Sequence, residues 1–282
     1  MTQVPAKVGV FGGGRMGAGI AHAFLTAGSD VGLIEANPEA ADAALGRVAS
    51  SLAASSDRGL LTDSVDSYLQ RFNATDDHQA LADADLVVEA VPEDPEIKAA
   101  VFSSIESVVG ADAVLASNTS SLSIDGIAAG LRDPARFLGL HFFNPVPASK
   151  LVEIVVGAKT DAEIVERAQR WVTELGKTAV TVRDAPGFAS SRLGVAIALE
   201  AMRMLDEGVA SVEDIDAAMT LGYRHPVGPL KTTDLVGLDV RLAIAEHLER
   251  ELGPRFAPPQ VLRDKVAAGE LGKKAGKGFY DW

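Results

Sequence analysis

Short apolar runs of strand length alternate with longer helical runs from the start of the chain. Residues 7–12 (KVGVFG) end in glycines and predict a strand, residues 16–27 (MGAGIAHAFLTA) predict an alanine-rich helix, and residues 30–36 (DVGLIEA) predict a second strand. A strand, a helix and a strand within roughly 30 residues are typical of a βαβ unit with parallel strands.

The alternation continues to residue 184. Further helices are predicted over 38–70 and 94–109, and further strands over 85–91, 113–120, 136–143, 150–157 and 178–184. Strands built almost entirely from Val, Ile and Leu are typical of a parallel sheet that helices cover on both faces. The predicted fold class is therefore α/β, with a Rossmann-type, doubly wound, mostly parallel sheet.

The pattern changes after this point. Residues 185–208 (APGFASSRLGVAIALEAMRMLDEG) contain a long helix, residues 211–222 (SVEDIDAAMTLG) contain another, and the remainder is helix and loop. We therefore expect a Rossmann-type domain over residues 1–183 and a smaller, all-helical domain over residues 184–282, of about 100 residues, which is an ordinary domain size.

Composition narrows the classes of function. The chain has 282 residues, a formal net charge of −13 and no cysteine. The negative charge argues against general affinity for nucleic acid or for an anionic membrane, so neither partner is expected. The absence of cysteine excludes disulfides, thiolate nucleophiles and cysteine-ligated metals, and no metal site is predicted.

The N-terminal residues and the apolar runs bear on location. The segment MTQVPAKVGVFGGG has no charged stretch followed by a long apolar run, which argues against a signal peptide. No apolar run reaches the length that spans a membrane. The absence of cysteine fits a reducing compartment, so a cytoplasmic protein is expected.

A glycine-rich loop follows the first predicted strand. Within GVFGGGRMGAGIA, Gly12, Gly14 and Gly17 have the spacing G-x-G-x-x-G and lead into a helix. Glycines allow a tight turn there and a close approach of backbone to a pyrophosphate at the positive end of the helix. Such a triplet alone is a weak signal, and a purely structural turn is the alternative. Its place in a βαβ unit predicts a dinucleotide site, with Met16 in the same loop.

Glu35 indicates which dinucleotide. It ends the second predicted strand, about 20 residues after the loop, where an acidic side chain binds the ribose hydroxyls of NAD. A carboxylate there repels the 2′-phosphate of NADP, and residues 35–37 (EAN) offer no arginine to receive it. NAD is therefore the predicted cofactor.

Hydride transfer needs a group that takes the hydroxyl proton, and histidine titrates in the useful range. Four of the five histidines fit structural or surface roles: His22 and His247 lie within predicted helices, His78 lies in a polar stretch that we expect to be exposed, and His225 precedes a proline in a turn. Only His141 lies near the end of a predicted sheet strand, where open α/β sheets form their ligand crevices.

The stretch GLHFFNPVPASKLVE suggests a partner for His141. The prolines of NPVP cannot continue a central strand, so the chain is expected to reverse there, and the next strand returns Glu153 beside His141. A carboxylate bonded to one ring nitrogen fixes the tautomer and stabilises the imidazolium. These residues alone also fit a satisfied core histidine and an unrelated glutamate.

Several longer motifs settle the comparison with known families. The chain resembles the L-3-hydroxyacyl-CoA dehydrogenase family over nearly its whole length, and within it the bacterial 3-hydroxybutyryl-CoA dehydrogenases. The resemblance rests on the motifs GVFGGGRMGAGIA, DLVVEAVPED, SNTSSLSI, GLHFFNPVPASKLVEIV, DAPGFASSR, GYRHPVGPLKTTDLVGLD and GKKAGKGFYDW.

The resemblance implies roles for individual residues. His141 becomes the general base in the oxidation, Glu153 its partner, and Ser120 the residue whose hydroxyl binds the 3-oxygen of the substrate and also borders the cofactor. Four more residues correspond to positions that contact or line the cofactor site: Glu93, Lys98, Asn144 and Lys274. Taken singly, Ser120 and these four are an ordinary capping serine, a loop carboxylate, a turn residue and solvated lysines.

Substrate contacts are less complete than in the family. Ser51 and Arg58 correspond to the helical region that contacts coenzyme A phosphates in relatives, a region that is rich in lysine in some of them and sparse here (SSLAASSDRG). Ser191 stands where PGFxxNR has an asparagine that helps to bind the substrate oxygen. Losing a well-placed donor to a developing oxyanion costs about 3 kcal/mol, which the serine hydroxyl recovers only in part.

The resemblance therefore implies an NAD-dependent oxidoreductase that interconverts (S)-3-hydroxyacyl-CoA and 3-oxoacyl-CoA, with short chains favoured. The segments GYRHPVGPL and TTDLVGLD imply a homodimer. Two alternatives remain open: a dehydrogenase of a free hydroxy acid or sugar acid on the same fold, and a non-catalytic NAD-binding protein, which only Ser191 favours.

Overall fold

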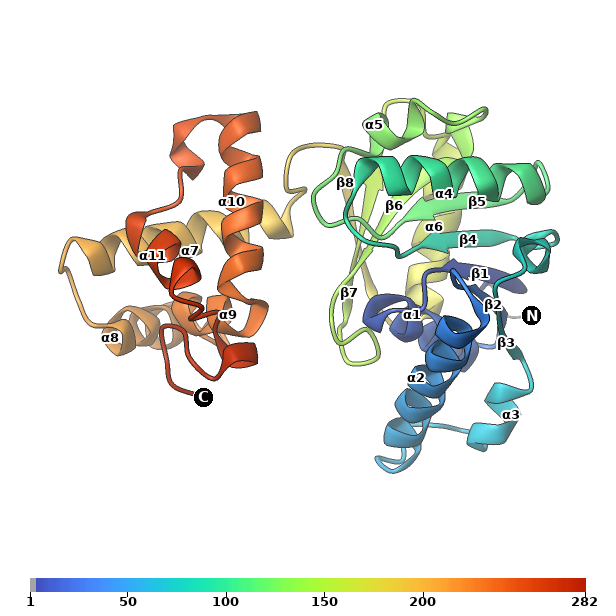
Figure 1. Cartoon of the computed structure of the whole chain (residues 1–282), viewed down its shortest axis with the longest axis horizontal. Helices are drawn as coiled ribbons and strands as arrows, with labels where there is room; N and C mark the ends of the chain where they lie inside the picture. The colour runs from blue at the N-terminus through green and yellow to red at the C-terminus, as the bar shows by residue number, and fades with distance from the viewer. Residues whose placement is uncertain (1–3) are drawn as a thin grey trace. The chain divides into compact units, whose positions relative to one another are not determined.

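The structure is a computed structural model that describes residues 4–282, and it divides into two compact units (Figure 1). The first unit ends at Asp184 and the second runs from Ala185 to Trp282. The sequence-based boundary lay one residue earlier, after residue 183.

The first unit contains one sheet of eight strands in the order β3-β2-β1-β4-β5-β6-β7-β8. The strands are β1 (Lys7–Phe11), β2 (Asp30–Ile34), β3 (Phe72–Thr75), β4 (Leu86–Glu89), β5 (Val114–Ser117), β6 (Phe137–Phe142), β7 (Leu151–Val156) and β8 (Thr178–Arg183). Neighbouring strands are parallel except β6 and β7, which are antiparallel. The predicted α/β fold class, with a mostly parallel sheet, is confirmed.

Helices cover both faces of this sheet (Figure 1). Side chains of α1 (Arg15–Ala27), α2 (Pro38–Ser56) and α6 (Ala162–Glu174) share one apolar core with the sheet. On the other face lie α4 (Pro95–Val108) and α5 (Ile124–Ala128), and the ring of Phe102 packs edge-on against Phe137 with 5.0 Å between ring centroids. Two short 3₁₀ turns, η1 (His78–Leu81) and η2 (Pro134–Arg136), connect these elements.

Two details differ from the sequence-based expectation. The single helix expected over 38–70 is two helices, α2 and α3 (Val65–Leu69), because Gly59 adopts a left-handed φ of +67° and Ser64 caps a new helix start. The edge strand β3 was not predicted, since it has only four residues and a largely polar sequence.

His78 also differs from its expected place. It is half-buried rather than exposed, because its ring packs at 5.1 Å from that of Phe11 and its Nδ1 is hydrogen-bonded to the Ser104 hydroxyl at 2.6 Å.

The second unit is helical, as predicted. Its elements are α7 (Ser190–Asp206), α8 (Val212–Ala217), the π-turn η3 (Ala218–Gly222), α9 (Pro229–Val236), α10 (Leu238–Leu252), η4 (Pro254–Phe256), α11 (Gln260–Ala267) and η5 (Lys273–Ala275). Its core includes the buried side chains of Val195, Leu199, Met202, Leu238 and Leu248. Across both units, none of the helices in residues 4–282 is long and apolar enough to cross a membrane.

Candidate active site

The glycine loop connects the end of β1 to the start of α1. Gly12 has a φ of +97°, and a β-carbon at Gly17 would lie 1.8 Å from the Gly12 carbonyl oxygen, so both positions require glycine. A β-carbon at Gly14 would meet no atom within 4 Å, which leaves open space in front of the helix. Met16, half-buried, packs against the apolar core behind the loop.

The start of α1 is suited to an anion. Gly14 is its N-cap and supplies no side-chain hydrogen bond, and no acidic residue lies in the first turn. The first backbone N–H groups of a helix lack partners within the helix and carry its positive partial charge, so this end can receive a phosphate group. The loop therefore fits the pyrophosphate of a dinucleotide.

Glu35 lies just after β2 and is held against the glycine loop. Its Oε1 accepts a hydrogen bond from the Gly13 N–H at 2.7 Å, and its Oε2 accepts one from the Ala36 N–H at 3.2 Å. The Glu35 carboxylate is thus positioned beside the glycine loop. An arginine that the sequence did not point to also reaches the loop, because Arg47 Nη1 of α2 donates to the Gly13 carbonyl at 3.0 Å.

His141 and Glu153 form a buried pair. They face each other in the antiparallel register of β6 and β7, and His141 Nδ1 lies 2.8 Å from Glu153 Oε2. Only 6% of His141 and 1% of Glu153 is exposed. The ring of Phe143 lies 4.3 Å from the imidazole, centroid to centroid. The chain reversal predicted from the NPVP prolines thus brings the carboxylate to the histidine.

The segment between β6 and β7 is fixed by a lysine from a distant part of the chain. Lys177 Nζ donates to the carbonyls of Val146 and Ser149, each at 2.6 Å. Burial lowers the pKa of Lys177 from its ordinary value. The clamp holds the segment that begins with Asn144, and no local sequence signal marks it.

A cavity of about 730 Å³ lies beside this segment, between α1 and α2. Asn144, Ser51, Arg15 and Arg47 are among its lining residues. Arg58, by contrast, lies in the exposed turn after α2 and is not among them. The structure thus brings Ser51 and Asn144 to one cavity with two arginines that the sequence had not singled out.

His22 stands behind this cavity. It is 3% exposed, and its Nδ1 is hydrogen-bonded to the Ser51 hydroxyl at 2.9 Å. Burial, and secondarily the charge of Lys177, lowers the pKa of His22 to about 4. The imidazole is therefore neutral at pH 7, which fits the structural role expected from sequence.

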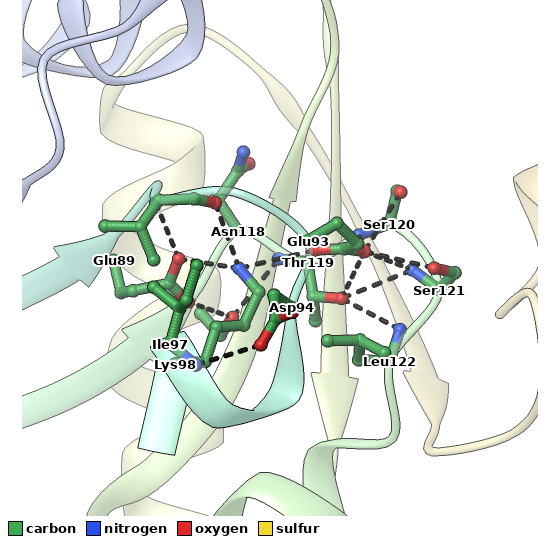
Figure 2. A network of polar contacts seen from close by, with 12 residues as sticks. Glu89, Glu93, Asp94, Ile97, Lys98, Asn118, Thr119, Ser120, Ser121 and Leu122 are labelled. Carbon is green, nitrogen blue, oxygen red and sulfur yellow. Dashed lines mark hydrogen bonds and ion pairs between the residues drawn. The ribbon is translucent and has the colours of Figure 1, made fainter. Parts of the chain in front are cut away.

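Glu93, Lys98 and Ser120 belong to one polar network beyond the carboxyl ends of β4 and β5 (Figure 2). Glu93 Oε1 accepts hydrogen bonds from the Thr119 hydroxyl at 2.7 Å, the Ser120 N–H at 2.8 Å and the Ser120 hydroxyl at 3.2 Å. Its Oε2 lies 3.3 Å from Lys98 Nζ. Loss of water raises the pKa of Glu93, but the charge of Lys98 and these hydrogen bonds outweigh it, so the pKa lies below its ordinary value.

The same network contains two residues that were not among the predicted site residues. Glu89 ends β4 and Ser117 ends β5, and neither has any exposed surface. Lys98 Nζ lies 2.6 Å from Glu89 Oε1, and the Ser117 hydroxyl donates to Glu89 Oε2 at 2.6 Å. The sequence signal was a charged residue inside the apolar run DLVVEAV, where a buried carboxylate needs a partner.

Two further predicted residues belong to the second unit. Ser191 is half-buried in the first turn of α7. Lys274 lies in η5, and its Nζ forms an ion pair with Asp239 Oδ2 at 2.6 Å. Within residues 4–282 no group of three or more His, Cys, Asp or Glu side chains is arranged to hold a metal ion.

Comparison with known proteins gives the family of both units. Residues 7–185 match the family described as "3-hydroxyacyl-CoA dehydrogenase, NAD binding domain", and residues 187–282 match "3-hydroxyacyl-CoA dehydrogenase, C-terminal domain". The first match confirms NAD as the cofactor of this domain.

Individual relatives match over the full chain. A probable 3-hydroxybutyryl-CoA dehydrogenase of Deinococcus radiodurans is 42% identical over 98% of this chain and 100% of its own length. A 3-hydroxyadipyl-CoA dehydrogenase of Escherichia coli is 42% identical over 98% of this chain and 58% of its own length. The crystal structure of (S)-3-hydroxybutyryl-CoA dehydrogenase from Ralstonia eutropha is 38% identical, covers 99% of each chain and has a TM-score of 0.94. The chain belongs to the 3-hydroxyacyl-CoA dehydrogenase family.

Proposed function

We propose that this chain interconverts (S)-3-hydroxyacyl-CoA and 3-oxoacyl-CoA with NAD, and that its substrates are short, of the 3-hydroxybutyryl-CoA and acetoacetyl-CoA class. The observation that carries the proposal is the buried pair of His141 and Glu153 at the end of β6, 2.8 Å apart. A carboxylate so placed prepares an imidazole for proton transfer.

The proton chemistry follows from that bond. Because His141 Nδ1 is bonded to Glu153, Nε2 is the nitrogen that takes the hydroxyl proton in the oxidation and returns it in the reduction. The Glu153 carboxylate stabilises the imidazolium that forms and holds the ring in one tautomer. In this low-dielectric site, removing the carboxylate charge raises the barrier to proton transfer.

Other side chains bind and orient. The hydroxyls of Ser120 and Ser191 are proposed to steady the substrate oxygen. When bound, NAD supplies the hydride chemistry at C3 of the substrate. We assign its binding to the glycine loop with Glu35, and to Glu93, Lys98, Asn144 and Lys274.

The coenzyme A portion carries phosphates, and the chain as a whole carries −13. Local cations must therefore recognise it. Ser51 and Arg58 were the candidates from sequence. Arg15 and Arg47 line the same cavity as Ser51, which supports this cavity as the binding region and favours them over Arg58.

The names of the relatives bear on the length of the acyl chain in the substrate. The relatives that are 42% identical include one named for 3-hydroxybutyryl-CoA and one named for 3-hydroxyadipyl-CoA. Most of the relatives that are 42% identical are named as 3-hydroxybutyryl-CoA dehydrogenases, which supports a short acyl chain. We further propose that the chain acts as a cytoplasmic homodimer that associates through the second unit.

The test is steady-state oxidation of NADH by acetoacetyl-CoA, with NADPH in parallel. The His141→Ala variant should lose at least about a thousandfold in kcat, because it removes the proton acceptor. His78→Ala is the matched control, since His78 is also hydrogen-bonded to a neighbouring side chain in the first unit but lies outside the proposed site. Its kcat should stay within about twofold.

Two results would contradict the proposal. A folded wild-type protein that binds NADH but turns over no short acyl-CoA would remove the short-chain assignment, and longer acyl-CoA esters and free hydroxy acids would then be assayed. Equal losses of kcat in His141→Ala and His78→Ala would show that His141 is not the general base.

A further inference from the structure

Glu89 is the most deeply buried charge in the polar network of Figure 2. It has no exposed surface, and its carboxylate receives three groups: Lys98 Nζ at 2.6 Å, the Ser117 hydroxyl at 2.6 Å and the Val91 N–H at 2.7 Å. These donors come from α4, from the end of β5 and from the segment after β4. One carboxylate therefore connects α4, the end of β5 and the segment after β4.

Lys98 is shared between two carboxylates. Its side chain is 1% exposed, and its Nζ lies 2.6 Å from Glu89 and 3.3 Å from Glu93 Oε2. The shorter contact is the one to the fully buried partner. The Glu93 side chain is 35% exposed and has room to turn towards water. The Lys98 ammonium group therefore limits where the Glu93 carboxylate can lie.

Glu93 in turn holds the Ser120 loop, defined as residues 119–122. Its Oε1 accepts from the N–H and hydroxyl groups of both Ser120 and Ser121, at distances between 2.8 and 3.2 Å. The Leu122 N–H donates to the Thr119 hydroxyl oxygen at 2.9 Å, and the Thr119 hydroxyl donates to Glu93. The chain of contacts from Glu89 thus ends on the Ser120 hydroxyl.

Stability alone does not account for this arrangement. Burying an ion pair costs much of what its attraction contributes, and well-packed apolar residues often replace such pairs without loss. A network that is fully hydrogen-bonded does, however, hold its members in one geometry. Here the members converge on one short loop at the carboxyl edge of the sheet.

We infer that Glu89 is a positioning residue, which acts through Lys98 and Glu93 to set the place of the Ser120 hydroxyl. The inference rests on the proposed function for the role of Ser120 in holding the substrate oxygen. Glu89 itself touches neither substrate nor cofactor in this scheme. A small displacement of a positioning group can cost about a hundredfold in rate.

The test compares Glu89→Gln with Glu106→Gln. Glu106 is the matched control: it lies in the same helix as Lys98, is 6% exposed, accepts from the Arg132 N–H at 2.9 Å and lies 3.6 Å from Arg136 Nη2. Amide hydrogen exchange is measured first, without cofactor or substrate. Glu89→Gln should speed exchange at residues 120–122, and Glu106→Gln should leave those amides unchanged.

A double-mutant cycle then links the loop to turnover. Glu89→Gln should lower kcat/KM for acetoacetyl-CoA between about tenfold and a hundredfold. In the Ser120→Ala background the same change should cost less than about threefold, because Glu89 acts through the hydroxyl that is already absent. If Glu89 were a purely structural residue, the losses in kcat/KM from Glu89→Gln and Ser120→Ala would multiply in the double variant.

The hydrogen-exchange result and the kinetic result each test the inference. Unchanged exchange at residues 120–122, or multiplicative losses in the cycle, would overturn the inference. An inactive wild-type protein would remove the proposed function, while the exchange comparison would still accept or reject Glu89 as the anchor of the loop. If Glu89→Gln does not fold, Ser117→Ala removes one donor to the same carboxylate and should speed exchange in the same residues; no change there would overturn the inference.

Discussion

Two buried histidines in the first unit have opposite surroundings. His141 faces the carboxylate of Glu153, whereas His22 faces the Ser51 hydroxyl and lies near the ammonium group of Lys177. A carboxylate favours the charged imidazolium, and burial beside a cation favours the neutral form. For His22, burial is the larger cause of the lowered pKa, and the charge of Lys177 adds to it.

The pKa of His22 makes the protein sensitive to acid. The pKa is lowered to about 4 in the folded protein, from the ordinary value of 6.5. The folded state thus prefers the neutral ring. The contribution of His22 to the free energy of unfolding is therefore fully present above pH 6.5 and is lost as the pH falls towards 4. At pH 5 the loss attributable to His22 is about 2 kcal/mol.

The corresponding variant is His22→Gln, which cannot titrate but can still bond to Ser51. We expect the drop in unfolding free energy between pH 7.5 and pH 5 to be smaller by about 2 kcal/mol in this variant. Urea titrations at the two pH values measure it. An identical drop in wild type and variant would mean that His22 does not carry the acid sensitivity.

At the scale of elements, the glycine loop combines two different requirements. Gly17 serves the turn itself, since a β-carbon there would lie 1.8 Å from the Gly12 carbonyl oxygen. Gly14 serves the space in front of α1, since a β-carbon there would meet nothing within 4 Å and its φ of −61° suits any residue. The same residue type is thus required for two separate reasons.

This difference predicts opposite outcomes for two alanine variants. Gly14→Ala should keep the melting temperature of the wild type and weaken NADH binding by about tenfold or more, because the methyl group occupies the space for the pyrophosphate. Gly17→Ala should lower the stability by roughly 3 kcal/mol or prevent folding, because the clash is with backbone. Thermal melts and NADH fluorescence titrations separate the two effects. Equal losses of stability in both variants would contradict the assignment of separate roles.

At the scale of the whole molecule, exposed apolar surface is unevenly distributed. Among the residues that the structure describes, most of the exposed large apolar side chains lie in the second unit, including Leu193, Leu221, Tyr223 and Leu235. A contiguous apolar patch on a protein surface is typical of a face that another chain covers. This distribution supports the proposed homodimer.

The dimer prediction is tested by sedimentation. Wild type should sediment with twice the chain mass of 29.4 kDa, and Leu193→Asp should shift it towards 29.4 kDa, because a buried, unpaired carboxylate opposes association. Leu60→Asp is the control, since Leu60 is 68% exposed in the first unit, close to the 63% of Leu193. A wild-type protein that sediments as a single chain at micromolar concentration would refute the prediction.

The sequence alone determined the class of the molecule. Short apolar runs between helical runs predicted the parallel sheet, and the switch to purely helical periodicity predicted the second, helical unit. The glycine loop predicted the dinucleotide site, and the NPVP prolines predicted the reversal that joins His141 to Glu153. All of these are local signals, because a period, a turn or a spacing is written in consecutive residues.

Only the tertiary structure decided which distant residues share one site. Arg47 beside the glycine loop, Lys177 on the segment after His141, and Glu89 with Lys98 and Ser117 are pairings of residues that lie between 9 and 34 positions apart. No local pattern marks such partners, because a buried charge states only that it needs a partner and not where along the chain that partner lies. The parallel sheet brings Glu89 and Ser117, at the carboxyl ends of β4 and β5, side by side, and the packing of helices and loops on the sheet brings Arg47, Lys98 and Lys177 to their partners.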